Sequence, residues 1–256
     1  MTHEDVASPK NIALTPTSFA DELPAPLPGD SIAAVGALAL GACCHSVPWM
    51  ALAFNFFAKV PEFVNNRMMI EFLRKVAMTV DSLTETVVGI RDELAKSAHY
   101  TNMIQHGMLQ VASGEEDQEF LDAVRNAAFN LHLSNKGDLT KKQVMILIRK
   151  MTAIQLRVLL VYNSYWNKSL SSADQAIIEL AGPDNDENHG KRLGALVRHV
   201  VPYQFVAVTV RELRALEVIQ GGVSGSHFEA DDDELEAVEV TDLGKLVLEI
   251  FAPLRN

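Results

Sequence analysis

The chain has 256 residues, of which 48% are apolar and 21% are charged, and this ordinary globular composition excludes collagen-like and wholly disordered proteins. Its formal net charge of -11 lies at the two ends, because residues 31–227 hold as many bases as acids. A neutral body offers nucleic acid no general attraction, so nucleic acid is a less favoured partner than protein. The two cysteines, Cys43 and Cys44, are adjacent, which excludes a disulfide framework and indicates a reducing compartment.

Residues 1–29 are poor in large apolar side chains and rich in proline. Because proline fixes φ and removes a backbone donor, these residues are expected to form a disordered leader. No basic start precedes an apolar core and a small-residue cleavage site, so no secretory signal is predicted. We expect a cytoplasmic protein, with inner-membrane association as the alternative. The prolines of the leader are Pro9, Pro16, Pro24, Pro26 and Pro28.

Residues 31–58 contain no Asp, Glu, Lys or Arg, and the segment is longer than the roughly 20 apolar residues that a spanning helix needs. Pro48 and two glycines interrupt it, which favours two short helices and therefore a helical hairpin over residues 30–60. Three interpretations stay open: the hairpin lies in the core, it inserts into a membrane when triggered, or it is a permanent anchor. If it inserts, the side chains expected to contact lipid are Trp49, Met50, Leu52, Phe54, Phe56 and Phe57.

Residues 69–94 carry apolar side chains at alternating steps of four and three. This spacing predicts one long helix with a single apolar seam. The seam can pack within the chain, which is the favoured interpretation, or it can form a dimeric coiled coil with a second copy. Its members are Met69, Leu73, Val76, Val80, Leu83, Val87, Ile90 and Leu94.

Helix-start signals recur after the seam. In each of them a Ser or Thr is followed three residues later by Glu or Gln, which is the spacing of a capping box. With the seam, the helices that they start define a helical body over residues 61–200. The expected helices span residues 114–134, 141–151, 153–166 and 173–181, and a further helix runs from 191 to 201.

Residues 201–256 change character and predict a winged-helix-like α+β module with an acidic wing. If this module reads DNA, its recognition helix would present Arg211 and Arg214 to phosphate or bases. The expected order is a helix over 203–216, a strand at 217–219, an acidic loop over 221–234, a strand over 235–240 and a last helix to about 251.

The sequence contains no motif that specifies an enzyme or a metal site. The glycine-rich stretch at 221–226 lacks residues that a nucleophile elbow or a P-loop requires. Asp184 begins an incomplete calcium loop, because His189 stands where the loop needs glycine. His99 and His106 are two helical turns apart, which is too far for one zinc ion. The sequence therefore predicts a non-enzymatic protein with no cofactor, no metal and no small-molecule substrate.

Several stretches between residues 115 and 252 share a pattern with a known family. They are FLDAVRNAAFNLHLSN at 120–135, VMILIRKM at 144–151, TAIQLRVL at 152–159, VRELRALEVIQ at 210–220 and VEVTDLGKLVLEIF at 238–251. Their order resembles bacterial proteins of the abortive-infection alpha type, and related helical proteins that end in a winged-helix-like unit. The resemblance implies a role in halting phage infection and carries over no active site.

The fold that we expect is mainly α, with a multi-helix body and the small C-terminal winged-helix-like module. The leading functional hypothesis is a non-enzymatic bacterial defence effector, in which the segment 31–58 acts on the membrane and the helical body restrains it. Two alternatives stay open: a winged-helix DNA-binding regulator, and a protein-interaction scaffold that uses the apolar seam. A protein partner or self-association is expected.

Overall fold

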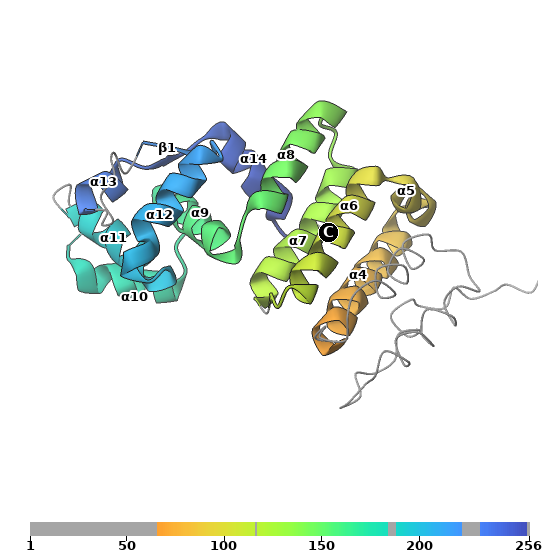
Figure 1. The fold of residues 1–256 in the computed structure, drawn as a ribbon, viewed down its shortest axis with the longest axis horizontal. Helices are drawn as coiled ribbons and strands as arrows, with labels where there is room; N and C mark the ends of the chain where they lie inside the picture. The colour runs from red at the N-terminus through yellow and green to blue at the C-terminus, as the bar shows by residue number, and fades with distance from the viewer. Residues whose placement is uncertain (1–65, 116, 184–187, 222–230, 255–256) are drawn as a thin grey trace, which may run out of the picture.

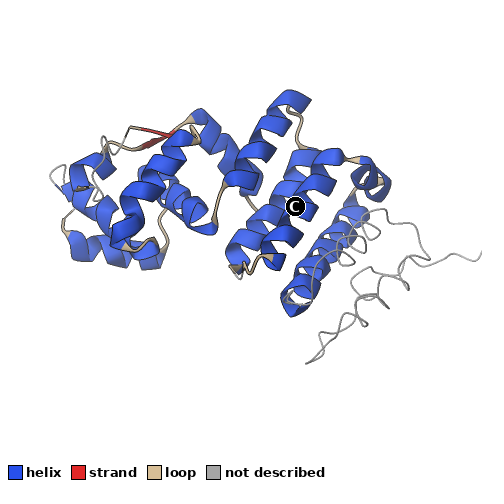
Figure 2. Cartoon of the chain, in the orientation of Figure 1, coloured by secondary structure: helices blue, strands red, loops and turns tan. Residues whose placement is uncertain are grey.

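A computed structural model describes residues 66–115, 117–183, 188–221 and 231–254 of the chain. Over these residues the protein is mainly helical, with eleven helices and one two-stranded sheet, so the prediction of a mainly α fold is confirmed. Figure 2 shows the helices in blue and the two short strands in red. The expected leader and apolar hairpin lie outside the described residues.

The elements follow one another with short connections. In chain order they are α4 (Asn66–Thr86), α5 (Ile90–Lys96), α6 (Ala98–Ala112), α7 (Gln118–Leu133), α8 (Asp138–Lys150), α9 (Ala153–Trp166), α10 (Ser172–Ala181), α11 (His189–Val200), α12 (Tyr203–Ala215), β1 (Ile219–Gln220), α13 (Asp232–Glu236), β2 (Glu239–Val240) and α14 (Asp242–Phe251). In Figure 1, α4–α7 gather at one end of the molecule, α9–α13 gather at the other, and α8 and α14 lie between them.

The heptad seam forms two helices instead of one. Val87 is 37% exposed, and the chain then turns at Gly89, whose φ of 80° is in the left-handed region that glycine favours. Leu83 is half-buried and packs at the edge of the core. The remaining six seam residues are buried on α4 and α5: Met69, Leu73, Val76, Val80, Ile90 and Leu94.

One part of the hydrophobic core forms where α4, α6 and α7 pack together. The ring of Phe72 lies directly over Gly107, so a side chain on that glycine would meet it at 2.3 Å. Tyr100 and Phe129 are fully buried and pack with their ring centroids 5.2 Å apart. The seam of α4 is therefore covered by helices of the same chain.

Helix α14 joins the two ends of the molecule. It contacts α7, α8 and α9, and its last carbonyl groups are held by two side chains of α7. Asn130 donates its amide to the carbonyl oxygens of Ile250 and Ala252 at 2.8 Å each, and Asn126 donates to that of Phe251 at 3.4 Å. These bonds satisfy carbonyl groups that a helix end otherwise leaves unpaired.

Helices α11 and α12 are joined by Val201 and Pro202 and cross at 99°. The connection is two residues long, so the chain changes direction sharply between the two helices. The strands β1 and β2 then pair antiparallel, with Ile219 opposite Val240 and Gln220 opposite Glu239.

The prediction of a strand over residues 235–240 is wrong for residues 235–238, because the short helix α13 runs to Glu236 and β2 begins only at Glu239. Asp231 caps this helix in a capping box with Glu234, and Leu235 is buried beneath it. Instead of standing in solvent as a wing tip, α13 packs on α11, where Gly190 and Gly194 leave room for Asp232.

Candidate functional site

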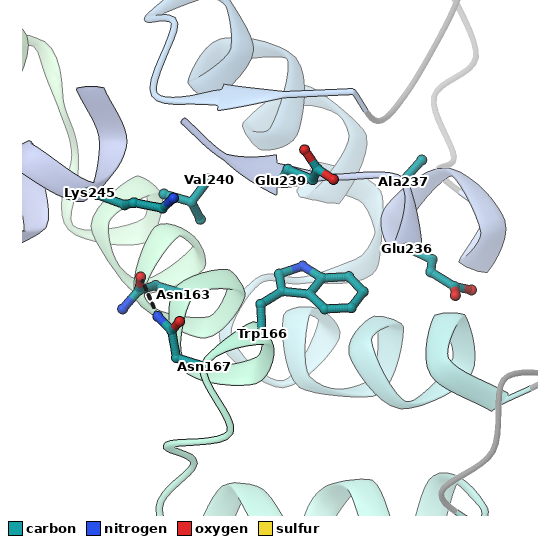
Figure 3. Close-up of a pocket in the computed structure, with 8 residues that line it drawn as sticks. All are labelled: Asn163, Trp166, Asn167, Glu236, Ala237, Glu239, Val240 and Lys245. Carbon is teal, nitrogen blue, oxygen red and sulfur yellow. Dashed lines mark hydrogen bonds between the residues drawn. The ribbon is translucent and has the colours of Figure 1, made fainter. Parts of the chain in front are cut away.

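A cavity of about 380 Å³ lies where the end of α9 faces β2 and the start of α14 (Figure 3). Trp166 occupies the middle of the view, and polar or charged side chains surround it on several sides. This volume is within the range of small-ligand pockets. The lining residues are Asn163, Trp166, Asn167, Glu236, Ala237, Glu239, Val240 and Lys245.

The indole ring of Trp166 is held in place by its neighbours. Its Nε1–H donates to the carbonyl oxygen of Val238 at 3.0 Å. Its ring stands edge-on to Tyr165, with 5.3 Å between centroids, and the Tyr165 hydroxyl in turn donates to the carbonyl oxygen of His189. Although it is fixed in this way, the Trp166 side chain is 41% exposed. The pocket therefore offers an aromatic surface that is already in position.

Three charged side chains line the cavity beside the Trp166 indole: Glu236, Glu239 and Lys245. Glu236 ends α13, and Glu239 on β2 accepts a hydrogen bond from the Gln220 side chain at 2.8 Å. Lys245 on α14 is largely exposed, and its Nζ lies 3.6 Å from an Asp242 oxygen. In Figure 3 Lys245 and Glu236 lie on opposite sides of Trp166. The two carboxylates outnumber the one ammonium among the residues that line this cavity.

The outer face of helix α12 carries apolar side chains. Tyr203 is 46% exposed, Phe205 52% and Val208 37%, and the last two are one helical turn apart. The guanidinium of Arg198 on α11 lies over the Tyr203 ring, 5.4 Å from its centroid. We call Phe205 and Val208, which share one side of the helix, the α12 patch; Tyr203 stands two residues before Phe205 and faces another way.

The two arginines predicted to read DNA lie near the other end of α12. Arg214 is exposed, whereas Arg211 is half-buried and donates its Nε–H to the carbonyl oxygen of Ala207 in its own helix. Glu212 lies between them in sequence and accepts a hydrogen bond from Gln155 of α9 at 2.8 Å. Residues 153–256 hold nine bases and sixteen acids, a net charge of -7. The helices α11 and α12 themselves hold five bases and one acid, so the acidic excess of this range lies outside them.

His99 and His132, which no sequence pattern connects, line the same groove. His99 at the start of α6 and His132 at the end of α7 line it with Glu93 and Asp138, and each imidazole Nε2 lies 3.8 Å from a carboxylate oxygen. Burial lowers the pKa of His132, and the nearby Glu93 opposes that shift. Within the described ranges, no group of three or more His, Cys, Asp or Glu side chains is placed to hold a metal ion.

His106, which is two helical turns from His99 on the same helix, is buried in the core. It is 5% exposed, and burial, with a smaller contribution from Arg149, lowers its pKa to about 4. The sequence spacing placed His99 and His106 on one helix, but only the tertiary fold brings His99 beside His132.

The expected lipid-contacting residues Trp49, Met50, Leu52, Phe54, Phe56 and Phe57 lie outside the described residues. Across the part of the chain that the structure describes, no single helix combines the length and apolar character needed to cross a bilayer. Only α11 and α12 taken together reach that length and character, and they are bent by 99°.

No protein-family model, curated protein or solved structure matches this chain. The resemblance to proteins of the abortive-infection alpha type therefore stays a prediction.

Proposed function

We propose that this chain is a non-enzymatic bacterial defence effector that docks a protein partner through the α12 patch. The observation that carries this proposal is the exposure of an aromatic and an aliphatic side chain, Phe205 and Val208, one turn apart on α12. Exposed aromatic side chains are typical of the centre of a protein interface, where they supply large contact areas. The role in defence rests on the resemblance described above.

The patch can supply the dominant side chains of an interface, which as a whole buries about 800 Å² per partner. A buried aromatic side chain removes about 150–250 Å² from water, and the exposed parts of Phe205 and Val208 together amount to roughly 170 Å². At about 25 cal/mol per Å², their burial contributes on the order of 4 kcal/mol before the entropy cost of association. This is the size of a small cluster of energetically dominant interface residues.

The arrangement of α11, α12, β1 and β2 supports a winged-helix-like interpretation of the unit. Two helices cross at 99° and an antiparallel strand pair follows them. Winged helices bind DNA or protein, and the charge decides between the two. DNA binding depends on neutralising phosphates with cations. Here Arg211 is half-buried and donates to the carbonyl oxygen of Ala207 in its own helix, so Arg214 is the one exposed arginine of the predicted pair. We therefore favour protein docking over DNA reading.

The test uses two variants with matched chemistry. The first changes Phe205→Asp together with Val208→Asp in the α12 patch. The second changes Leu180→Asp on α10, a side chain that is 90% exposed and lies outside the patch. Both variants should keep the helical circular dichroism of the wild type. We expect only the first to abolish phage protection or growth arrest on expression.

A second measurement addresses the DNA-binding regulator. Fluorescence anisotropy with duplex DNA at physiological salt should show no binding by the wild-type protein. Tight binding that weakens, and whose salt dependence becomes flatter, in the variant Arg211→Ala with Arg214→Ala would replace the proposed docking function with DNA regulation.

The uncharged segment 31–58 supports a more specific proposal for how the effector acts. We propose that it disturbs the membrane when the protein is triggered. Phe54→Asp with Phe57→Asp would place charges in hydrocarbon at a cost of about 2.5–3.5 kcal/mol each, and should prevent loss of membrane potential on expression. If the wild-type protein arrests growth while the potential stays intact, the membrane proposal is wrong, although partner docking by α12 still stands.

A further inference from the structure

The Trp166 pocket combines an aromatic surface with carboxylates, and proteins use this combination to recognise organic cations. A cation placed over an indole face is attracted by the quadrupole of the ring, and tryptophan is the best of the aromatic side chains for this. Flanking carboxylates add charge attraction and accept hydrogen bonds. We infer that the Trp166 pocket is a binding site for an alkylammonium or guanidinium group.

The indole is arranged for this role before any ligand arrives. Its Nε1–H is used by the Val238 carbonyl, and its orientation is fixed by Tyr165, which is itself held by the His189 carbonyl. A ring that is both fixed and 41% exposed loses little conformational freedom on binding. These bonds hold the edge of the ring and leave part of its surface to the pocket.

The charged residues that line the cavity favour a cationic ligand over an anionic one. Glu236 and Glu239 both line the cavity, and the hydrogen bond from Gln220 keeps the Glu239 carboxylate in a defined position. Lys245 is the one cation among the lining residues, and its Nζ lies close to Asp242. Attraction of a cation therefore outweighs attraction of an anion here.

The volume of the cavity fits one extended cationic chain. If each heavy atom takes the roughly 30 Å³ that a water molecule occupies in the liquid, about 380 Å³ holds a dozen. This matches an arginine- or lysine-like side chain, or a free polyamine fragment. The cationic group can therefore belong to a side chain of a protein partner or to a small metabolite.

Trp166 itself supplies the signal for the test, because the chain has only two tryptophans. In the full-length variant Trp49→Phe, Trp166 is the only tryptophan, and its fluorescence reports on the pocket. We expect saturable quenching by N-acetyl-arginine amide with a dissociation constant of about 1 mM or tighter. The citrulline analogue, which has the same shape and no charge, should not bind. Stronger binding of agmatine or spermidine would identify a free small cation as the source, and stronger binding of arginine amide would identify a protein side chain.

Isothermal titration calorimetry on variants measures how much each lining residue contributes to cation binding. Trp166→Leu should weaken binding about tenfold, and Trp166→Phe, which keeps an aromatic ring, should weaken it less. Glu236→Gln with Glu239→Gln should also weaken it, whereas Lys245→Ala should strengthen it by removing a like charge. Circular dichroism must show that each variant is folded.

Three results would overturn this inference: no saturable binding of any cation by the full-length protein, equal binding of arginine and citrulline, or unchanged binding in the double glutamine variant. None of them affects docking through the α12 patch, which is on a different helix.

Discussion

Gly190 lies where α13 crosses α11, and replacing it by alanine tests whether the acidic helix is held against the body of the protein. A Cβ atom at this position would stand 2.6 Å from the backbone oxygen of Asp232. Ordinary contacts begin near 3.4 Å, so α13 would have to move away by about 0.8 Å. The obstacle is main chain and has no rotamer that relieves the contact.

Two opposing contributions set the magnitude. Overpacking of this kind costs about 1–3 kcal/mol. Alanine in a helix gains up to about 1 kcal/mol over glycine. We therefore expect Gly190→Ala to lower the free energy of unfolding by about 1–2 kcal/mol, which corresponds to a fall in melting temperature of roughly 3–6 °C for a chain of this size.

Gly194, one turn further along α11, provides the matched control. The atom nearest to its Cβ position is a side-chain oxygen of Asp232, at 2.5 Å, which can rotate away. The rotation would break the ion pair between Asp232 and Arg198, but both side chains are about 30% exposed, so the loss is about 0–1 kcal/mol. The gain in helix propensity offsets it, and Gly194→Ala should be nearly neutral. Urea and thermal unfolding followed by circular dichroism measure both variants. Equal stability of Gly190→Ala and the wild type, or a larger loss for Gly194→Ala, would refute the close packing of α13 on α11.

Three further predictions concern the core and use the same unfolding measurements. Val80→Asp should destabilise the protein severely because it buries an unpaired charge, whereas Val87→Asp, at an exposed position on the same seam, should be tolerated; equal effects would contradict the break between α4 and α5. Asn130→Ala should cost about 1–3 kcal/mol because it removes two hydrogen bonds to the end of α14, and a neutral result would show that these bonds do not hold it. Because burial lowers the pKa of His106 to about 4, the unfolded state binds more protons between pH 4 and 6.5, and stability should fall as the pH drops through that range by up to about 3 kcal/mol. The variant His106→Leu should show a shallower fall, and an unchanged pH dependence would contradict the assignment.

The sequence predicted most of the helices because their start signals are local. The capping box of Thr152 and Gln155 is formed as expected, whereas α10 is capped by Ser171 instead of the expected Ser172, and α8 begins at Asp138 instead of after Thr140. The expected start near Ser113 was misplaced, because Ser113 ends α6 and the cap of α7 is Asp117. Both residues are good caps, and only the packing of α6 decides between them.

Features that depend on distant contacts were not predictable from local pattern. The heptad spacing runs through Val87 without interruption, although Gly89 two residues later turns the chain. The acidic residues before β2 were expected in a loop and a strand, but Leu235 needs a buried position and α11 provides it. The Trp166 pocket was missed for the same reason, since its residues come from α9, α13, β2 and α14. Phe205 in the sequence VPYQFVAV was the local signal that could have pointed to the α12 patch.

Site-specific photocrosslinking in cells tests the docking function most directly. A photoreactive phenylalanine analogue replaces Phe205 in the α12 patch, and in a second strain it replaces Leu180, which is 90% exposed on α10. We predict a discrete protein adduct from position 205 and none from position 180, with the adduct reduced when Val208 is also changed to Asp. Equal adducts from both positions, or crosslinks from position 205 to DNA instead of protein, would contradict docking of a protein partner on the α12 patch.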